Sequence, residues 1–195
     1  MNSGLAAMVG QQRPRVSCAP PSPRTEYAED ALEFCLEIAG IRLDQWQRDI
    51  LFASLGKRRD GQWSAFEVGL VVPRQNGKSE LLIARILLGL FYLREKLMIY
   101  SAHQFDTAME VFFRLVDIVE NTPELRDEVH LNRGDKVGIY SHGQEGIRLK
   151  SGERIRFKAR TSGGGRGFSC DCLMLDEAMI LAESAHGAVL PTLSA

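Results

Sequence analysis

The sequence predicts an α/β domain with a mostly parallel sheet flanked by helices. Short apolar runs alternate along the chain with longer segments whose apolar residues recur at helical spacing. Several of these runs are apolar on both faces, which is typical of strands in the interior of a parallel sheet. The chain has 195 residues, of which 45% are hydrophobic, and this is enough for one core of ordinary size.

The N-terminal part of the chain divides into a tail and two helices. Residues 1–24 contain the run RPRVSCAPPSPR, and a segment so rich in Pro, Ser and Arg is predicted to be disordered. The folded domain is predicted to span residues 25–195. Its first helix is expected over residues 25–40, and its second over residues 45–56, where Asp44 can act as the N-cap.

The middle of the chain alternates strands and helices. Residues 63–73, WSAFEVGLVVP, are predicted to form a strand that enters the parallel sheet. A helix over residues 79–95 is apolar nearly all round and should be buried. Residues 96–103 then predict a buried strand, residues 104–121 an amphipathic helix, and residues 122–130 a short helix.

The C-terminal part begins with a hairpin. Residues 147–160, IRLKSGERIRFKAR, alternate apolar and basic side chains around Ser-Gly, which indicates two strands joined by a tight turn. Residues 161–169 read as a glycine-rich loop. Residues 170–178, CDCLMLDEA, predict a strand that ends in two acids, and residues 179–195 predict a last helix and tail.

The net charge of the chain gives it no overall attraction for nucleic acid. The net charge is −1, so any contact with nucleic acid needs a local basic patch. The hairpin offers one, and it is interpreted either as a DNA path or as the solvated face of the hairpin, which is the commoner case. The basic side chains of this hairpin are Arg148, Lys150, Arg154, Arg156 and Lys158.

The cysteines and histidines do not have the spacing of a metal site. The chain also lacks a secretory signal and an apolar run long enough to cross a bilayer, so a soluble cytoplasmic protein without a disulfide framework is predicted. The residues concerned are Cys18, Cys35, Cys170, Cys172, His103, His130, His142 and His186.

A phosphate-binding loop is indicated by Gly77, Lys78 and Ser79, which lie between a predicted strand and a predicted helix. In such a loop, backbone N–H groups surround the β-phosphate, the lysine neutralises the β and γ oxygens, and the hydroxyl is a ligand of Mg²⁺. The following helix adds its N-terminal dipole. The common pattern has a glycine where this chain has Val72, and an ordinary surface turn is the alternative.

A pair of acids supplies the second half of an NTP site. Asp176 and Glu177 follow the apolar run Leu173–Leu175, about a hundred residues after Lys78. Asp176 is expected to hold Mg²⁺, directly or through water, and Glu177 to orient and polarise the attacking water. The alternative is a pair of solvated acids at the end of a strand.

Several stretches resemble the ATPase domain of the large terminase subunit of tailed bacteriophages, the motor that packages viral DNA. They are PRQNGKSE, SAHQFDTAMEVF, SGGGRGFSCDCLMLDEA and GAVLPTLSA, and the resemblance runs from about residue 41 to the end. Terminases carry a variant loop with Arg-Gln before x-G-K-[ST], so Val72 is no defect. The resemblance implies a P-loop NTPase fold of the RecA-like (ASCE) type.

The resemblance also implies roles for individual residues. Gln47 is similar to the glutamine that reads adenine, with Gln45 a less favoured candidate, and Trp46 is expected in the core, with a platform that stacks on the base as the less favoured alternative. Arg74 resembles the loop arginine that senses the γ-phosphate. Arg166 aligns with an arginine offered to the active site of a neighbouring subunit, and the tip of a flexible loop is the equally weighted alternative. The remaining loop residues expected to bind the nucleotide are Gln75, Asn76, Gly77, Lys78 and Ser79.

Cofactors, partners and location follow from the same resemblance. ATP and Mg²⁺ are the expected cofactors, and the expected partners are double-stranded DNA, the small terminase subunit, the portal protein of the procapsid and further copies of the chain in a ring. No membrane partner is expected. The location implied is the host cytoplasm, transiently at the portal vertex, and not the mature virion.

Terminase ATPase domains continue into a strand with a coupling motif and then a nuclease domain, and this chain stops before both. The missing strand lies between the loop strand and the acid strand. We therefore expect a C-terminally incomplete sheet, a truncated or split part, weak stability and negligible ATP hydrolysis by this chain alone. Two alternatives stay open. One is a superfamily 2 helicase-like ATPase, although the run DEAM completes neither DEAD nor DExH, and the other is a non-hydrolysing nucleotide-binding or assembly fragment.

Overall fold

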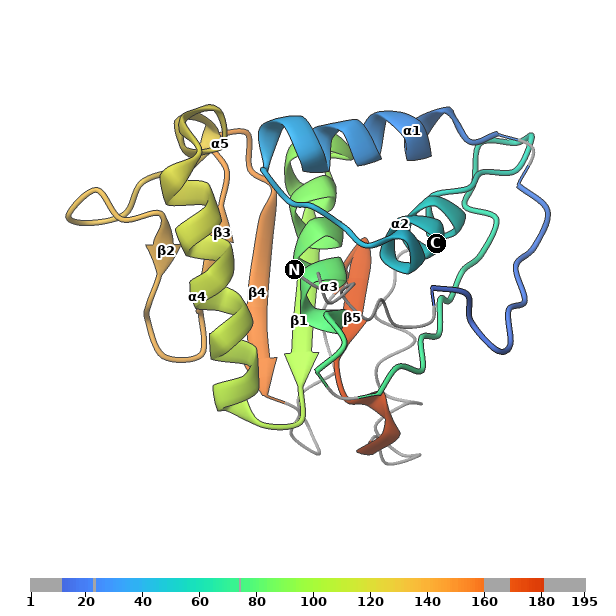
Figure 1. Cartoon of the computed structure of the whole chain (residues 1–195). Helices are drawn as coiled ribbons and strands as arrows, with labels where there is room; N and C mark the ends of the chain where they lie inside the picture. Colours follow the sequence, from blue (N-terminus) through green and yellow to red (C-terminus); the bar gives the residue numbers. More distant parts are fainter. Residues whose placement is uncertain (1–11, 23, 74, 160–168, 181–195) are drawn as a thin grey trace, which may run out of the picture.

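A computed structural model describes residues 12–22, 24–73, 75–159 and 169–180 of the chain (Figure 1). The elements are α1 (Glu26–Glu33), η1 (Phe34–Ile38), α2 (Gln45–Ser54), α3 (Lys78–Leu87), η2 (Leu88–Tyr92), β1 (Leu97–Ala102), α4 (Phe105–Asn121), α5 (Pro123–Glu128), β2 (Gly138–Ile139), β3 (Gly146–Arg148), β4 (Arg154–Ala159), β5 (Cys172–Leu175) and η3 (Ala178–Ile180). The predicted helices before residue 131 and the predicted hairpin are confirmed. The predicted glycine-rich loop and the predicted last helix lie almost entirely outside the described residues.

The strands form one sheet in the order β2-β3-β4-β1-β5. β1 is parallel to β4 on one side and to β5 on the other, whereas β3 is antiparallel to β4 and β2 is antiparallel to β3. The sheet is therefore parallel in its core with an antiparallel edge, which confirms the predicted α/β class. All six residues of β1 are buried, as their apolar sequence predicts.

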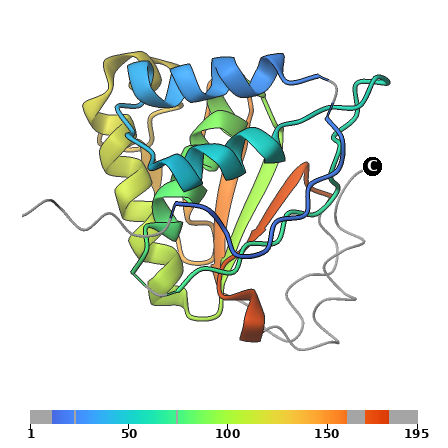
Figure 2. The same ribbon diagram turned by 45° about the vertical axis from the view of Figure 1, so that its right-hand side comes forward.

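The helices α3 and α4 cover one face of this sheet, and α1 and α2 lie beyond α3 (Figures 1 and 2). The core between sheet and helices is aromatic on the α4 side. The ring of Phe157 on β4 lies 5.3 Å from the ring of Phe112 on α4 and 5.4 Å from the ring of Tyr100 on β1. This packing fixes the carboxyl ends of the parallel strands, where ligands bind in open α/β sheets.

The predicted strand over residues 63–73 is wrong. Trp63 makes an isolated bridge to Lys57, but residues 65–73 belong to no strand, and Val71 is 101% exposed and Phe66 is 71% exposed. Within the described ranges, the edge of β5 that faces away from β1 has no partner strand. An apolar run is buried in a sheet only where a neighbouring strand accepts its backbone hydrogen bonds, and this run lacks such a neighbour.

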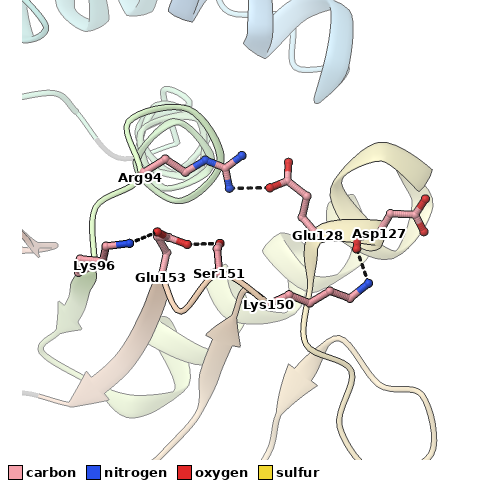
Figure 3. Close-up of polar contacts among 7 residues, drawn as sticks. All are labelled: Arg94, Lys96, Asp127, Glu128, Lys150, Ser151 and Glu153. Carbon is pink, nitrogen blue, oxygen red and sulfur yellow. Dashed lines mark hydrogen bonds and ion pairs between the residues drawn. The ribbon is translucent and has the colours of Figure 1, made fainter.

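A polar network ties the amino ends of β1 and β4 to α5 (Figure 3). Glu153, which is 1% exposed, accepts hydrogen bonds from Lys96 and Ser151. Nearby, Arg94 forms an ion pair with Glu128 at 2.5 Å. The Nζ of Lys150 donates to the backbone oxygen of Asp127 at 2.6 Å. The turn of the β3–β4 hairpin is thus held from both sides, at the end of the sheet opposite Asp176.

Replacing Glu153 with glutamine is expected to destabilise the fold by about 1–3 kcal/mol at neutral pH, since a buried charge-assisted hydrogen bond is weakened. The hydrogen bonds from Lys96 and Ser151 lower the pKa of Glu153 from 4.5 to about 2. Its contribution to stability is therefore complete above pH 4.5 and is lost as the pH falls towards 2. Urea unfolding of the wild type and E153Q across pH 2–7 measures both effects. Glu37→Gln, at an exposed position, is the control, and an unchanged pH profile in E153Q would contradict the prediction.

Candidate nucleotide-binding site

The loop before α3 contains two residues with left-handed backbone conformation. Gln75 has φ of 62° and Gly77 has φ of 75°, so two residues of this short loop adopt the left-handed conformation. A glycine accommodates this conformation freely, whereas at Gln75 it stores strain of the kind that clusters at binding sites. α3 then starts at Lys78, and its first N–H groups have no acceptor within the helix. Ser79 lies in this first turn.

Lys78 and Asp176 meet at the carboxyl end of the sheet. The Nζ of Lys78 lies 2.5 Å from Oδ1 of Asp176. Lys78 comes from the first turn of α3 and Asp176 directly follows β5, so two motifs separated by about a hundred residues share one location. The side chain of Lys78 is 32% exposed and that of Asp176 is 4% exposed, which leaves the ammonium group accessible from one side.

Asp176 is held in place by several donors. The hydroxyl of Tyr100 donates to Oδ2 at 2.7 Å, and the backbone N–H of Glu177 donates to Oδ1 at 2.8 Å. Burial acts to raise the pKa of Asp176, but the hydrogen bonds from Lys78 and Tyr100 and the charge of Lys78 outweigh it, so the pKa lies below its ordinary value. The carboxylate therefore stays charged and fixed in orientation.

Glu177 lies at a turn with an unusual backbone. Its φ is 53°, which is uncommon for a residue with a side chain, and its backbone oxygen accepts a hydrogen bond from Ile180 at 3.1 Å. The side chain is half-buried and comes from the same strand end as Asp176. Both acids thus lie at the carboxyl end of β5, and Asp176 makes the contact with the start of α3.

Gln47 is buried against the loop and makes two hydrogen bonds. Its Nε2 donates to the backbone oxygen of Gly77 at 2.7 Å, and its Oε1 accepts from the N–H of Asp44 at 2.6 Å. In this position the side chain braces the loop against α2. A Cβ at residue 77 would lie 2.9 Å from Nε2 of Gln47, so any other residue there would displace the end of this side chain. Gln45 is exposed and bonds Asp49 instead.

The structure brings Gln47, Gly77, Lys78, Asp176 and Tyr100 into one connected group. Tyr100 was not a predicted site residue. The sequence indicated only that it lies on a buried strand, and a tyrosine in an apolar strand is the one signal that its hydroxyl needs a buried partner. Other predicted residues are placed as follows: Trp46 packs against the core, the described histidines His103, His130 and His142 are exposed, and Arg74 and Arg166 lie outside the described residues.

The oxygen donors near Lys78 suit Mg²⁺ but do not form a cage. Asp176 offers a carboxylate, and the hydroxyl of Ser79 is a hard ligand of the kind that Mg²⁺ prefers. Among the described residues, no group of three or more His, Cys, Asp or Glu side chains could hold a metal ion. Such a sparse donor set fits an ion that takes most of its ligands from phosphates and water.

Comparisons with known proteins support the fold. No family model and no curated protein sequence matches the chain. The large terminase of bacteriophage HK97 matches with a TM-score of 0.61 and 20% identity, over 85% of this chain and 36% of that one. The ATPase domain of a Thermus phage large terminase matches with a TM-score of 0.45 and 23% identity, over 61% of this chain and 51% of that one. The chain thus spans about a third of the length of the HK97 protein and shares the fold of the part that it matches.

Proposed function

We propose that this chain is the nucleotide-binding part of an ATP-hydrolysing DNA-packaging terminase. The observation that carries the proposal is the contact of Lys78 with Asp176, because a loop lysine and a strand-end carboxylate converge on one triphosphate–metal site in P-loop enzymes. The fold shared with the HK97 large terminase supports the choice of this class of P-loop enzyme. In this site, Ser79 and Asp176 would hold Mg²⁺, which neutralises charge on the β and γ phosphates.

The chemistry assigns a step to each group. On nucleotide binding, the Lys78 ammonium moves from Asp176 to the phosphate oxygens, and the N–H groups at the start of α3 receive the β-phosphate. Glu177 orients a water molecule in line with the γ-phosphorus and accepts its proton as the new P–O bond forms. The bond to the β,γ-bridging oxygen breaks, and the products are ADP and phosphate. Arg74 and Arg166 are proposed to contact the γ-phosphate, Arg166 from a neighbouring subunit.

The wider proposal follows the same class of enzyme. Duplex DNA is the proposed cargo, and further copies of the chain, the small terminase subunit and the portal protein are the proposed partners in the infected host cell. No described helix is long and apolar enough to cross a membrane. Gln47 is proposed to read adenine through its remaining amide hydrogen while it braces Gly77.

Two structural features favour a second candidate function, a nucleotide-binding fragment that does not hydrolyse ATP by itself. In the described part of the chain, the outer edge of β5 is unpaired, and residues 65–73, which lead into the loop, are unpaired as well. Both features fit a sheet that takes up another strand between them. We infer that a sheet lacking that strand would hold the loop and Glu177 too loosely for the positioning that catalysis needs.

The experiment that tests the proposal measures binding and turnover separately. A fluorescent ATP analogue is titrated into the 195-residue chain with and without Mg²⁺, and phosphate release is followed in parallel. Magnesium-dependent binding with negligible turnover is the expected result. No binding at millimolar nucleotide would overturn the proposal, and turnover at the rate of a complete motor would overturn the non-hydrolysing candidate.

Tyr100→Phe is expected to raise the Mg²⁺ concentration needed for half-maximal nucleotide binding by about tenfold, since groups that orient a metal ligand contribute 10–100-fold to metal affinity. The variant keeps the ring that packs on Phe157 and loses the hydrogen bond to Asp176. Tyr92→Phe is the matched control, because it removes a hydroxyl that donates to Asp30 at 2.9 Å, outside the site. Equal Mg²⁺ requirements in the two variants would contradict the role given to Tyr100.

A further inference from the structure

Four basic side chains lie on one face of the sheet. Arg154, Arg156 and Lys158 alternate along β4, so their side chains point to the same face. Arg148 on β3 is directly opposite Arg154 in the antiparallel register and shares that face. We call these four residues the basic sheet face. Ile155, between the arginines, points the other way into the core and is 1% exposed.

The basic sheet face points away from α3 and α4. The helix-covered face carries the main core, with Phe157 of β4 packed on Phe112 of α4. On the opposite face, the described residues form only a small apolar cluster of Leu97, Ile99 and Cys170 with Leu173. Figures 1 and 2 show α3 and α4 on one side of the sheet. Arg148 and Arg154 are exposed, and Arg156 and Lys158 are half-buried.

Within the described part of the chain, the charge of the three arginines of this face is not neutralised. No described acid forms an ion pair with Arg148, Arg154 or Arg156. Two carboxylates next to the starts of β4 and β5 are engaged elsewhere, since Glu153 bonds Lys96 and Ser151, and Asp171 accepts the N–H of Leu97 at 2.9 Å. Burial and the adjacent Arg156 both lower the pKa of Lys158, as expected on a surface of positive potential.

We propose that the basic sheet face binds the phosphate backbone of duplex DNA. Successive side chains on one face of β4 are about 6.6 Å apart, so the face presents a row of separate cations along one line. Three of the four are arginines, whose planar forks suit phosphate oxygens. The net charge of the whole chain is −1, so this attraction is confined to a patch. The choice of DNA among polyanions rests on the proposed function.

The test compares two double variants in DNA binding. Arg154→Gln with Arg156→Gln removes two cations from the basic sheet face, and Arg42→Gln with Arg48→Gln removes two exposed cations near and on α2 as the control. Binding of a labelled duplex of arbitrary sequence is measured by fluorescence anisotropy between 50 and 200 mM salt, without nucleotide. The first variant is expected to bind roughly tenfold more weakly. The slope of log affinity against log salt concentration should fall in magnitude by about 2, because each lost phosphate contact lowers that slope by about 0.9. The control should match the wild type.

The outcomes separate this inference from the proposed function. Neither pair of substitutions should change nucleotide binding measured on the same samples. A wild-type chain that binds DNA but no nucleotide would contradict the proposed function and leave this inference in place. The single variant Arg154→Gln, at an exposed position, should lower the slope by about 1 even if the double variant unfolds. The inference would be overturned if the wild-type chain did not bind DNA or bound only an acidic polypeptide. It would also be overturned if the variants kept the full salt dependence of the wild type.

Discussion

Lys78→Ala is expected to weaken nucleotide binding by at least a hundredfold, which corresponds to about 3 kcal/mol. The ammonium is the one described cation that contacts Asp176, and its position at the first residue of α3 places it beside the N–H groups proposed to hold the phosphates. Without it, the phosphate charge is met only by the helix N–H groups, Mg²⁺ and the arginines proposed to contact the γ-phosphate. Titration with a fluorescent ATP analogue in the presence of Mg²⁺ measures the loss.

The same substitution has a second consequence for Asp176. Its carboxylate is 4% exposed and loses the donor that does most to lower its pKa, so its pKa should rise. Thermal unfolding of K78A therefore accompanies the binding assay, to separate loss of affinity from loss of fold. Lys136→Ala, an exposed lysine at the far edge of the sheet, is the control. Wild-type affinity in K78A would remove the basis for the nucleotide site.

Glu177→Gln is expected to preserve nucleotide binding and to lower hydrolysis by roughly 10²–10⁴-fold, the usual contribution of a general base. The amide keeps the size of the side chain but cannot accept the proton of the attacking water. The hydrogen bond from residue 177 to Asp176 comes from the backbone, so the substitution leaves it in place. Phosphate release under single-turnover conditions, in the assembled motor where turnover is expected, measures the effect.

Two results would contradict the role of Glu177. One is unchanged hydrolysis in E177Q, and the other is equal loss of binding and hydrolysis, which would indicate a structural defect. Glu110→Gln on the exposed side of α4 tests for nonspecific effects of losing a carboxylate. Because the φ of Glu177 is 53°, Glu177→Asn provides a second variant that tolerates this backbone conformation but shortens the side chain.

The sequence predicts well where local pattern and tertiary structure agree. β1 is apolar at nearly every position and is buried at every position, and the alternation of Ile155 and Phe157 with basic residues describes β4 correctly. The two-residue strand β2 was not predicted. Its Gly138 pairs with Ile147 of the β3–β4 hairpin, which is a contact outside its own segment of sequence. Two residues are also too few to show the alternation of apolar and polar side chains that predicts a strand.

The error at residues 63–73 has a different cause. An apolar run predicts burial, but burial in a sheet depends on a neighbouring strand, and that neighbour is not encoded in the run itself. In the described structure β5 pairs with β1 alone, and Val71 is exposed. The predicted strand therefore depended on a neighbouring strand that the described residues do not supply.

The site shows the same division between local motif and distant contact. The loop around Lys78 and the acids after β5 are visible as motifs, because each is a short run with fixed spacing. The hydroxyl of Tyr100 reaches Asp176 across 76 positions of sequence, and Gln47 reaches Gly77 across 30. Such contacts depend on the register of β1 with β5 and on the packing of α2 against α3, which no local pattern specifies.

The most direct measurement of the central claim is a crystal structure of the chain with Mn²⁺ and a non-hydrolysable ATP analogue, with the metal located by anomalous scattering. The account predicts that the amine of Lys78 leaves Asp176 and lies about 2.7–2.9 Å from phosphate oxygens. It places the metal about 2.1 Å from the Ser79 hydroxyl, with Asp176 as a direct or water-mediated ligand. A nucleotide bound elsewhere, or a Lys78–Asp176 pair left intact beside a bound triphosphate, would contradict it.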